Sequence, residues 1–185
     1  TEFKMLAPAL SQEAIYDLGP QLFGKTKKQN QSAGDRILFL ISSKLKLHNL
    51  VAVNLTNSGV TDSAVSFFFD ELSDKKSGQS YNSLRKATFL KSKDIKDKTA
   101  EKIAGIIRDG GLNALELLDL SGTAITATGV LLLVQALKDA QKAQRFQLYN
   151  VILPSELLGT ESHKELQSIL SENRDKRHKK GALKQ

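Results

Sequence analysis

The sequence predicts an α/β fold built as a solenoid, with a parallel β-sheet along one face and helices along the other. Three observations support this prediction. A short strand-like pattern recurs through the middle of the chain, a stripe of apolar residues at helical spacing follows the first three copies, and the copies lie about 30 residues apart. A repeated strand–helix unit of this size sets successive strands side by side and parallel, because each connection returns through its helix.

The strand-like pattern is clearest in two segments that align without a gap. One runs from Leu50 to Asp62 and the other from Leu115 to Ala127, and both follow L-x-x-[LV]-x-L-x-x-[ST]-x-[VI]-T in their first twelve positions. The second copy in chain order, Leu84 to Phe89, fits if one residue is inserted before Ile95. A gapless alignment would aim Arg85 into the core, which costs far more free energy than a one-residue bulge.

A fourth copy is predicted from Ala143 to Leu153, with Phe146 and Leu148 at the fourth and sixth positions. The four strands are then expected near residues 50–56, 84–91, 115–121 and 144–149. Sixth positions of successive copies are separated by 34, 31 and 28 residues in this alignment. It places Val151 at the ninth position, where the other copies carry a hydroxyl, so we expect the last turn to be less regular.

Each of the first three strand patterns precedes apolar residues at i, i+3, i+4 and i+7, the spacing of a helix with one buried face. The three stripes are Val65, Phe68, Phe69 and Leu72; Ala100, Ile103, Ala104 and Ile107; and Val130, Leu133, Val134 and Leu137. Side-chain oxygens before each stripe predict helix starts, because they can accept hydrogen bonds from the first free amides. These residues are Thr61 and Asp62, Asp97 and Thr99, and Thr126 and Thr128.

The remaining segments predict caps for the two ends of the solenoid. Residues 1–49 are expected to form an N-terminal helical cap, with helices at Ser11–Phe23 and Asp35–Leu47 and a basic loop at 25–34. Residues 50–172 hold the repeats and a C-terminal capping helix that begins at the capping box Ser162–Glu165. Residues 173–185 are interpreted as a solvated basic tail.

These repeats resemble the leucine-rich repeats of the ribonuclease-inhibitor-like type over roughly residues 50–170. The resemblance implies a short horseshoe with a concave parallel sheet and convex helices. One departure is the ninth position, usually Asn, which is Ser58, Ser92, Thr123 and Val151 here. The Lys-, Asn-, Gln- and Ser-rich loops are also similar to those of leucine-rich-repeat effectors that intracellular bacteria inject into host cells. That similarity implies a host protein as partner and a location in the cytoplasm or in a host cytosol.

The residue inventory disfavours several classes of chemistry. The chain has no Cys, and its three His, at 48, 163 and 178, lack metal-ligand spacing and are interpreted as surface residues. Gly110 and Gly111 follow a predicted helix instead of opening one, so they do not form a phosphate loop. No apolar run approaches the ~18 residues of a membrane span. We therefore expect no catalysis, cofactor or metal. One leucine-rich-repeat family supports GTP hydrolysis, which leaves a GTPase activator using Arg85, Arg108 or Arg145 as an alternative.

The formal net charge of +7 is concentrated in two segments. The tail carries a net +5, with Asp175 against Arg174, Lys176, Arg177, Lys179, Lys180 and Lys184. Lys25, Lys27 and Lys28 add three charges, so the rest of the chain is close to neutral. Binding of nucleic acid or another anionic surface through these segments is the alternative function that this charge suggests.

The leading prediction is a non-enzymatic, monomeric protein-interaction module that binds its partner on the concave strands. Alternate strand residues share a face, which gives a middle column of Asn54, Thr88, Asp119 and Gln147. The flanking columns are Thr56, Leu90, Ser121 and Tyr149 on one side, and Ala52, Lys86, Leu117 and Arg145 on the other. Four strands span only about 15 Å, which favours a peptide, helix or loop as ligand. Leu90, Leu117 and Tyr149 are the expected apolar anchors.

A second candidate surface is the convex face, where Phe67 and Leu132 occupy equivalent helical positions. Packing against a neighbouring loop is the simpler explanation of these two side chains, and a partner contact or a dimer patch is the alternative.

Overall fold

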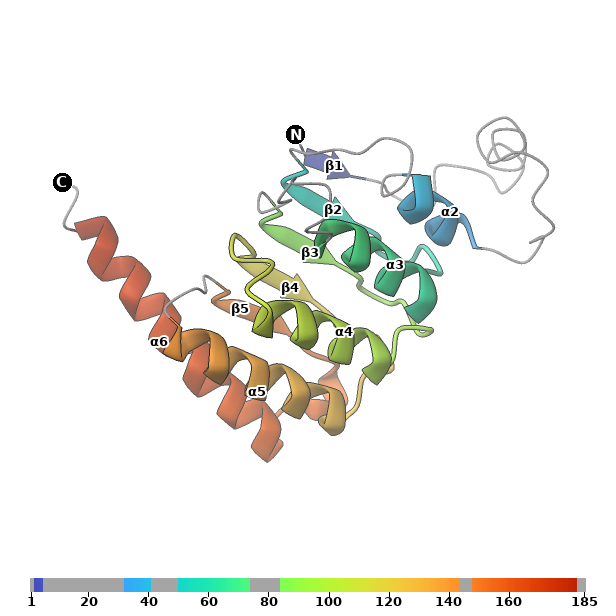
Figure 1. Cartoon of the computed structure of the whole chain (residues 1–185). Helices are drawn as coiled ribbons and strands as arrows, with labels where there is room; N and C mark the ends of the chain where they lie inside the picture. The colour runs from blue at the N-terminus through green and yellow to red at the C-terminus, as the bar shows by residue number, and fades with distance from the viewer. Residues whose placement is uncertain (1, 5–31, 41–49, 74–83, 144–147, 183–185) are drawn as a thin grey trace.

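The centre of the fold is a five-stranded parallel sheet whose strand order follows the order of the chain (Figure 1). A computed structural model describes residues 2–4, 32–40, 50–73, 84–143 and 148–182. The strands are β1 (Glu2–Lys4), β2 (Ala52–Asn54), β3 (Lys86–Thr88), β4 (Leu117–Asp119) and β5 (Asn150–Ile152). Every neighbouring pair is parallel. The predicted α/β class with a parallel sheet is therefore confirmed.

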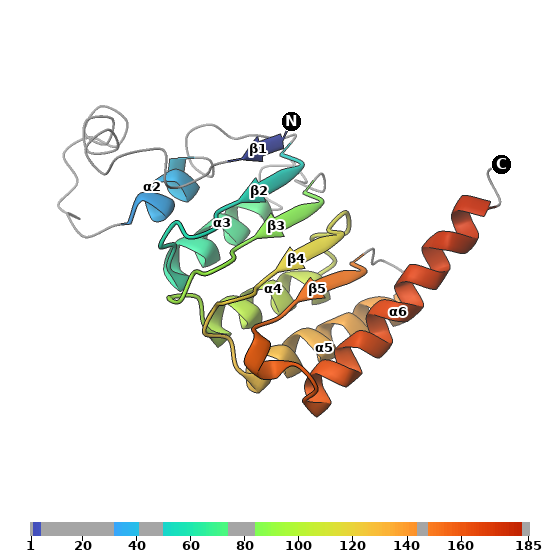
Figure 2. The same ribbon diagram turned by 180° about the vertical axis from the view of Figure 1, so that it is seen from behind.

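The helices alternate with the strands and gather on one side of the sheet. They are α2 (Ala33–Leu40), α3 (Asp62–Ser73), α4 (Asp97–Arg108), α5 (Ala127–Lys142) and α6 (Glu161–Ala182), with a short 3₁₀ helix, η4 (Ser155–Leu157). Each α-helix packs on the next, and α6 lies beside α5 at the end of the sheet. Figure 2 shows the opposite face of the sheet, which none of the described helices covers.

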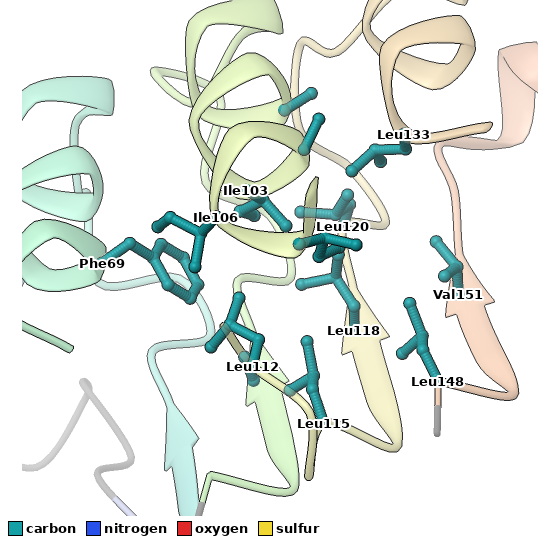
Figure 3. Packing of buried hydrophobic residues seen from close by; sticks show 14 of the residues in the cluster. Phe69, Ile103, Ile106, Leu112, Leu115, Leu118, Leu120, Leu133, Leu148 and Val151 are labelled. Carbon is teal, nitrogen blue, oxygen red and sulfur yellow. The ribbon is translucent and has the colours of Figure 1, made fainter. Parts of the chain in front are cut away.

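The apolar positions of the repeated pattern fill the layer between sheet and helices. Leu55, Phe89 and Leu120, at the sixth position of the first three copies, are each fully buried. The stripes of α4 and α5 are buried against them, as predicted, and Figure 3 shows Ile103 and Leu133 pointing into this layer. Burial of each such side chain contributes roughly 1.5–3 kcal/mol, so this layer is the main source of stability among the described residues.

The fourth copy lies five residues further along the chain than predicted. Val151 pairs with Leu118 in the strand Asn150–Ile152, so the predicted register, which gave this place to Phe146, is wrong. Of the strand predicted at 144–149, residues 144–147 fall outside the described part of the chain, and Leu148 and Tyr149 precede β5. The apolar positions are Leu148, Val151 and Leu153, all buried, and they repeat the L-x-x-L-x-L spacing. Figure 3 shows Leu148 and Val151 in the buried layer. The reason is burial: this register provides three aliphatic side chains for the core, whereas the predicted one began with Ala143.

The inserted residue in the second copy is present where the sequence indicated. Ala87 pairs with both Val53 and Leu118, which fixes the register of β3 on each side. Ile95 is fully buried, whereas Arg85 is exposed, as the argument from charge burial required.

The aspartates at the helix starts link successive units instead of capping their own helices. Each carboxylate accepts a hydrogen bond from the backbone N–H that precedes the next helix: Asp35 from Thr61 (2.8 Å), Asp62 from Lys96 (2.9 Å) and Asp97 from Thr126 (2.7 Å). We call Asp35, Asp62 and Asp97 the aspartate ladder. The predicted caps at Asp62 and Asp97 are therefore wrong, while Thr126 does cap α5, accepting from the N–H of Thr128. The ladder holds each helix start at a fixed spacing from the next.

The two ends of the chain differ from their predicted forms. β1 lies inside the segment predicted as a helical cap, and α2 covers part of the expected helix at 35–47. The expected helix at 11–23 and most of the basic loop fall outside the described residues. The capping box is wrong, because α6 begins at Glu161 and the Oγ1 of Thr160 accepts from the N–H of His163.

The segment predicted as a basic tail is helical for most of its length, because α6 continues to Ala182. A basic run favours the C-terminal end of a helix, where cations interact well with the exposed carbonyls. Asn173 attaches this helix to the sheet by donating from Nδ2 to the carbonyl of Leu148 (2.8 Å).

Substitution of two helical glycines by alanine is predicted to have opposite effects on the free energy of unfolding. A Cβ on Gly129 of α5 would overlap the ladder carboxylate of Asp97 and lie 2.9 Å from Ile125, so Gly129→Ala should destabilise the fold by about 1–3 kcal/mol. A Cβ on Gly105 of α4 meets nothing within 4 Å, so Gly105→Ala should stabilise it by about 0.5–1 kcal/mol. Urea unfolding of the two variants measures both; equal effects would contradict the close packing at Gly129.

Candidate binding face

The helix-free side of the sheet, which we call the open face, carries two rows of side chains set by strand register. Val53, Ala87, Leu118 and Val151 point into the core, so their strand neighbours point to the open face. The first row across β2 to β5 is Ala52, Lys86, Leu117 and Asn150, and the second is Asn54, Thr88, Asp119 and Ile152.

Most of the predicted site residues lie on this face, and those from the fourth copy do not. Asn54, Lys86, Thr88, Leu117 and Asp119 are on the strands as predicted, with Thr56, Leu90 and Ser121 just beyond them. Arg145 and Gln147 fall outside the described residues. Tyr149 precedes β5 instead of lying on it, so its assignment to the face is wrong.

Asn150 and Ile152 take the places predicted for Arg145 and Gln147. Pro154, two residues beyond Ile152, is buried. The signal that could have found them is the L-x-x-L-x-L spacing of Leu148 to Leu153, which was present in the sequence.

Two polar residues of the second row are held in place by the hydroxyl residue two positions later. The Oδ1 of Asn54 accepts from the N–H (3.1 Å) and the Oγ1 (2.7 Å) of Thr56. The Oδ1 of Asp119 accepts from the N–H (3.0 Å) and the Oγ (2.6 Å) of Ser121. Because these bonds fix both side chains, the polar groups in the middle of the open face are preorganised for binding.

A chain of three side chains crosses the edge where the strands begin. The Nη1 of Arg85 lies 2.6 Å from Oε1 of Glu116, and the Oη of Tyr149 donates to Oε2 of the same carboxylate (3.3 Å). Glu116 is only 6% exposed, so the half-exposed guanidinium neutralises a nearly buried charge. Arg85 and Tyr149 therefore have a structural partner inside this chain.

The apolar part of the open face lies over β3 to β5. Leu90 and Leu117 are half-buried, and Ile152 is 40% exposed. We call these three residues the apolar patch. Leu117 stands between exposed Lys86 and half-buried Asn150, and Ile152 stands beside half-buried Asp119, so apolar and polar groups alternate across the sheet.

The convex candidates pack against their own chain. Phe67 stacks on Phe39 of α2, with ring centroids 5.1 Å apart, and Leu132 packs against the core. Internal packing was the simpler explanation and it holds, although the neighbour of Phe67 is a helix and not a loop.

The other candidate groups are dispersed. Arg108 is exposed at the end of α4, Arg174 is exposed on α6, and Lys176, Arg177, Lys179 and Lys180 lie on the last turns of that helix. Among the residues that the structure describes, no group of three or more His, Asp or Glu is arranged to hold a metal ion. None of the described helices is both long and apolar enough to cross a membrane.

Comparison with known proteins identifies a related fold but no family. No protein-family model matches the chain, and no curated protein matches it. A solved structure of leiomodin-1 actin-binding site 2 is similar, with 19% sequence identity and a TM-score of 0.56 over 83% of this chain and 96% of that one. This likeness shows a shared α/β fold.

The Arg85–Glu116 contact predicts a non-additive pair of substitutions. Arg85→Met removes the cation beside a nearly buried carboxylate and should cost about 1–2 kcal/mol, less than in a fully buried pair because half of the Arg85 side chain is in water. Glu116→Gln in the same background should recover part of this loss, because a neutral amide is cheaper to bury. Urea unfolding measures the coupling. The exposed Arg108→Met is the control, with a change within about 0.5 kcal/mol, and strict additivity would contradict the pairing.

Proposed function

We propose that this protein is a non-enzymatic interaction module, a short leucine-rich-repeat solenoid that binds a segment of a protein partner on its open face. The observation that carries the proposal is the one-sided sheet: all the described helices lie away from the open face (Figure 2). Parallel sheets in globular proteins are normally covered on both faces. A face left open by the fold is therefore the natural seat for a ligand.

The composition of the open face supports a protein ligand. The apolar patch of Leu90, Leu117 and Ile152 is flanked by Lys86, Asp119 and Asn150, and such alternation of apolar anchors and polar groups is typical of protein interfaces. Five strands span about 19 Å, which suits a helix, loop or extended peptide better than a broad flat surface.

The repeat assignment is supported by the corrected fourth copy, whose sixth position, Leu153, lies 33 residues after Leu120, close to the earlier intervals of 34 and 31. The similar structure is, by its name, an actin-binding site, so this kind of fold can present a protein-binding surface. The loop composition supports the further proposal that the partner is a host-cell protein, met after injection of this chain into the host cytosol.

Selection of peptide ligands tests the open face directly. Short random peptides displayed on phage are selected on the immobilised full chain, and the bound sequences are synthesised and titrated by fluorescence anisotropy. The double variant Leu117→Lys with Ile152→Glu should weaken binding at least about tenfold, because it places charges where apolar anchors seat.

Leu131→Glu provides a matched control, because Leu131 is a 50% exposed apolar residue on α5, away from the open face. It should leave the affinity unchanged, and circular dichroism should show all variants folded. Peptides that bind the double variant as tightly as the unmodified chain would overturn the proposal.

A further inference from the structure

The second repeat unit differs from its neighbours in the charge of its exposed loop. Lys91, Lys93, Lys96 and Lys98 all lie between the end of β3 and the first turn of α4, and all four are exposed. We call these four residues the lysine cluster. Lys86, also exposed, stands on β3 of the same unit.

Equivalent positions in the adjacent units are neutral. Equivalence follows from shared backbone bonds: the N–H of Asn57 and of Lys91 each donate to the next unit's loop, and the N–H groups of Thr61, Lys96 and Thr126 each donate to a ladder aspartate. Where the second unit has its four lysines, the first has Asn57, Gly59, Thr61 and Ser63, and the third has Gly122, Ala124, Thr126 and Thr128. The charge is thus a property of one unit and not of the repeat.

These lysines are unfavourable for the fold itself. Lys96 occupies the N-cap of α4 without a side-chain capping bond, whereas Thr126 caps α5 at the equivalent position, and losing a cap costs ~1 kcal/mol. Positive charges at a helix N-terminus also oppose the helix dipole. Lys91 adopts a left-handed backbone with φ of 61°, where its neighbouring unit has Gly122.

No ion pair joins any of the four lysines to another described residue. This holds although Asp94, which is exposed, lies between Lys93 and Lys96 in the sequence. The cluster therefore keeps its positive charge on the surface at a cost to local stability. Residues that depart from local rules without a structural gain mark functional positions.

We propose that the lysine cluster receives the acidic part of the partner segment whose apolar side chains seat on the open face. This inference rests on the proposed function and adds the chemistry of the ligand: a peptide with Asp or Glu adjoining Leu, Ile or similar residues. Leu90 precedes Lys91 directly, so the apolar patch and the cluster are continuous along the chain. Charge complementarity would both steer the encounter and fix the direction of the bound segment.

An acidic protein segment fits this surface better than a nucleic acid. Asp119 stands in the middle of the open face, where it would repel a phosphate backbone. Single strands are bound largely by stacking on aromatic rings. Of the aromatic residues directly next to β3 and β5, Phe89 is buried in the core and Tyr149 is engaged with Glu116.

The selected peptides also test the cluster. Those peptides should be enriched in Asp and Glu. Their binding should weaken about tenfold in the triple variant Lys91→Gln, Lys93→Gln, Lys96→Gln. Raising the salt concentration should weaken binding further, both for the unmodified chain and for this variant. A second triple variant, Lys142→Gln, Lys164→Gln, Arg174→Gln, removes the same charge from exposed positions on α5 and α6 and should change affinity less than twofold. The cluster variant should melt at the same temperature or higher, since no ion pair or cap is lost.

The outcomes separate the two proposals. Peptides without acidic enrichment, sensitive to the substitutions at Leu117 and Ile152 but not to the cluster variant, would overturn the inference and leave the open face as the binding site. Equal losses in the two triple variants would overturn it as well, because only net charge would then matter. Tighter binding of a single-stranded RNA oligonucleotide than of any selected peptide, lost in the cluster variant, would assign the cluster to nucleic acid and also overturn it. Peptides insensitive to both sets of substitutions would overturn both proposals.

Discussion

Burial of the apolar side chains between the sheet and the helices is the constraint on which the other features depend. Each unit contributes three such positions from its strand and a stripe from its helix, and these side chains fix the register of every strand from β2 to β5. Since side chains alternate along a strand, fixing the buried set also fixes which residues face outward. The open face is thus specified by core residues that no ligand would contact.

The sequence predicted the fold well where one unit contained both an apolar strand pattern and a helical stripe after it. In the first three copies an apolar strand pattern preceded a helical stripe, so Val53, Ala87 and Leu118 could be aligned, including the insertion before Ile95. In the fourth copy the helix that follows is separated from its strand by η4, and Leu148 fits either of two alignments. Periodicity alone could not choose between them.

The other differences have comparable physical causes. β1 is three residues long and depends on its pairing with β2. A segment this short has no hydrophobic periodicity from which a strand could be predicted. The end of α6 lacks an apolar stripe, and its helicity rests on continuity with the packed turns that hold Leu166 and Ile169. The aspartates looked like caps because Asp is a good capping residue. Their bonds to the following unit depend on the spacing between helices, which sequence does not contain.

The error in the fourth copy matters for the site because the register shift of five residues is odd. An odd shift exchanges the buried and exposed faces of a strand, which removed Tyr149 from the open face and introduced Ile152. The tyrosine then joined Arg85 and Glu116 at the sheet edge, a chain whose members come from three different units.

Regularity in this fold is itself informative about function. Units that share a backbone should carry similar residues wherever stability alone decides, as Thr61 and Thr126 do before α3 and α5. Lys96 breaks that rule at the same position and gives up the cap, while its backbone N–H still keeps the ladder bond to Asp62. The departure is therefore confined to the side chain, which leaves the scaffold intact and changes only what the surface offers to a partner.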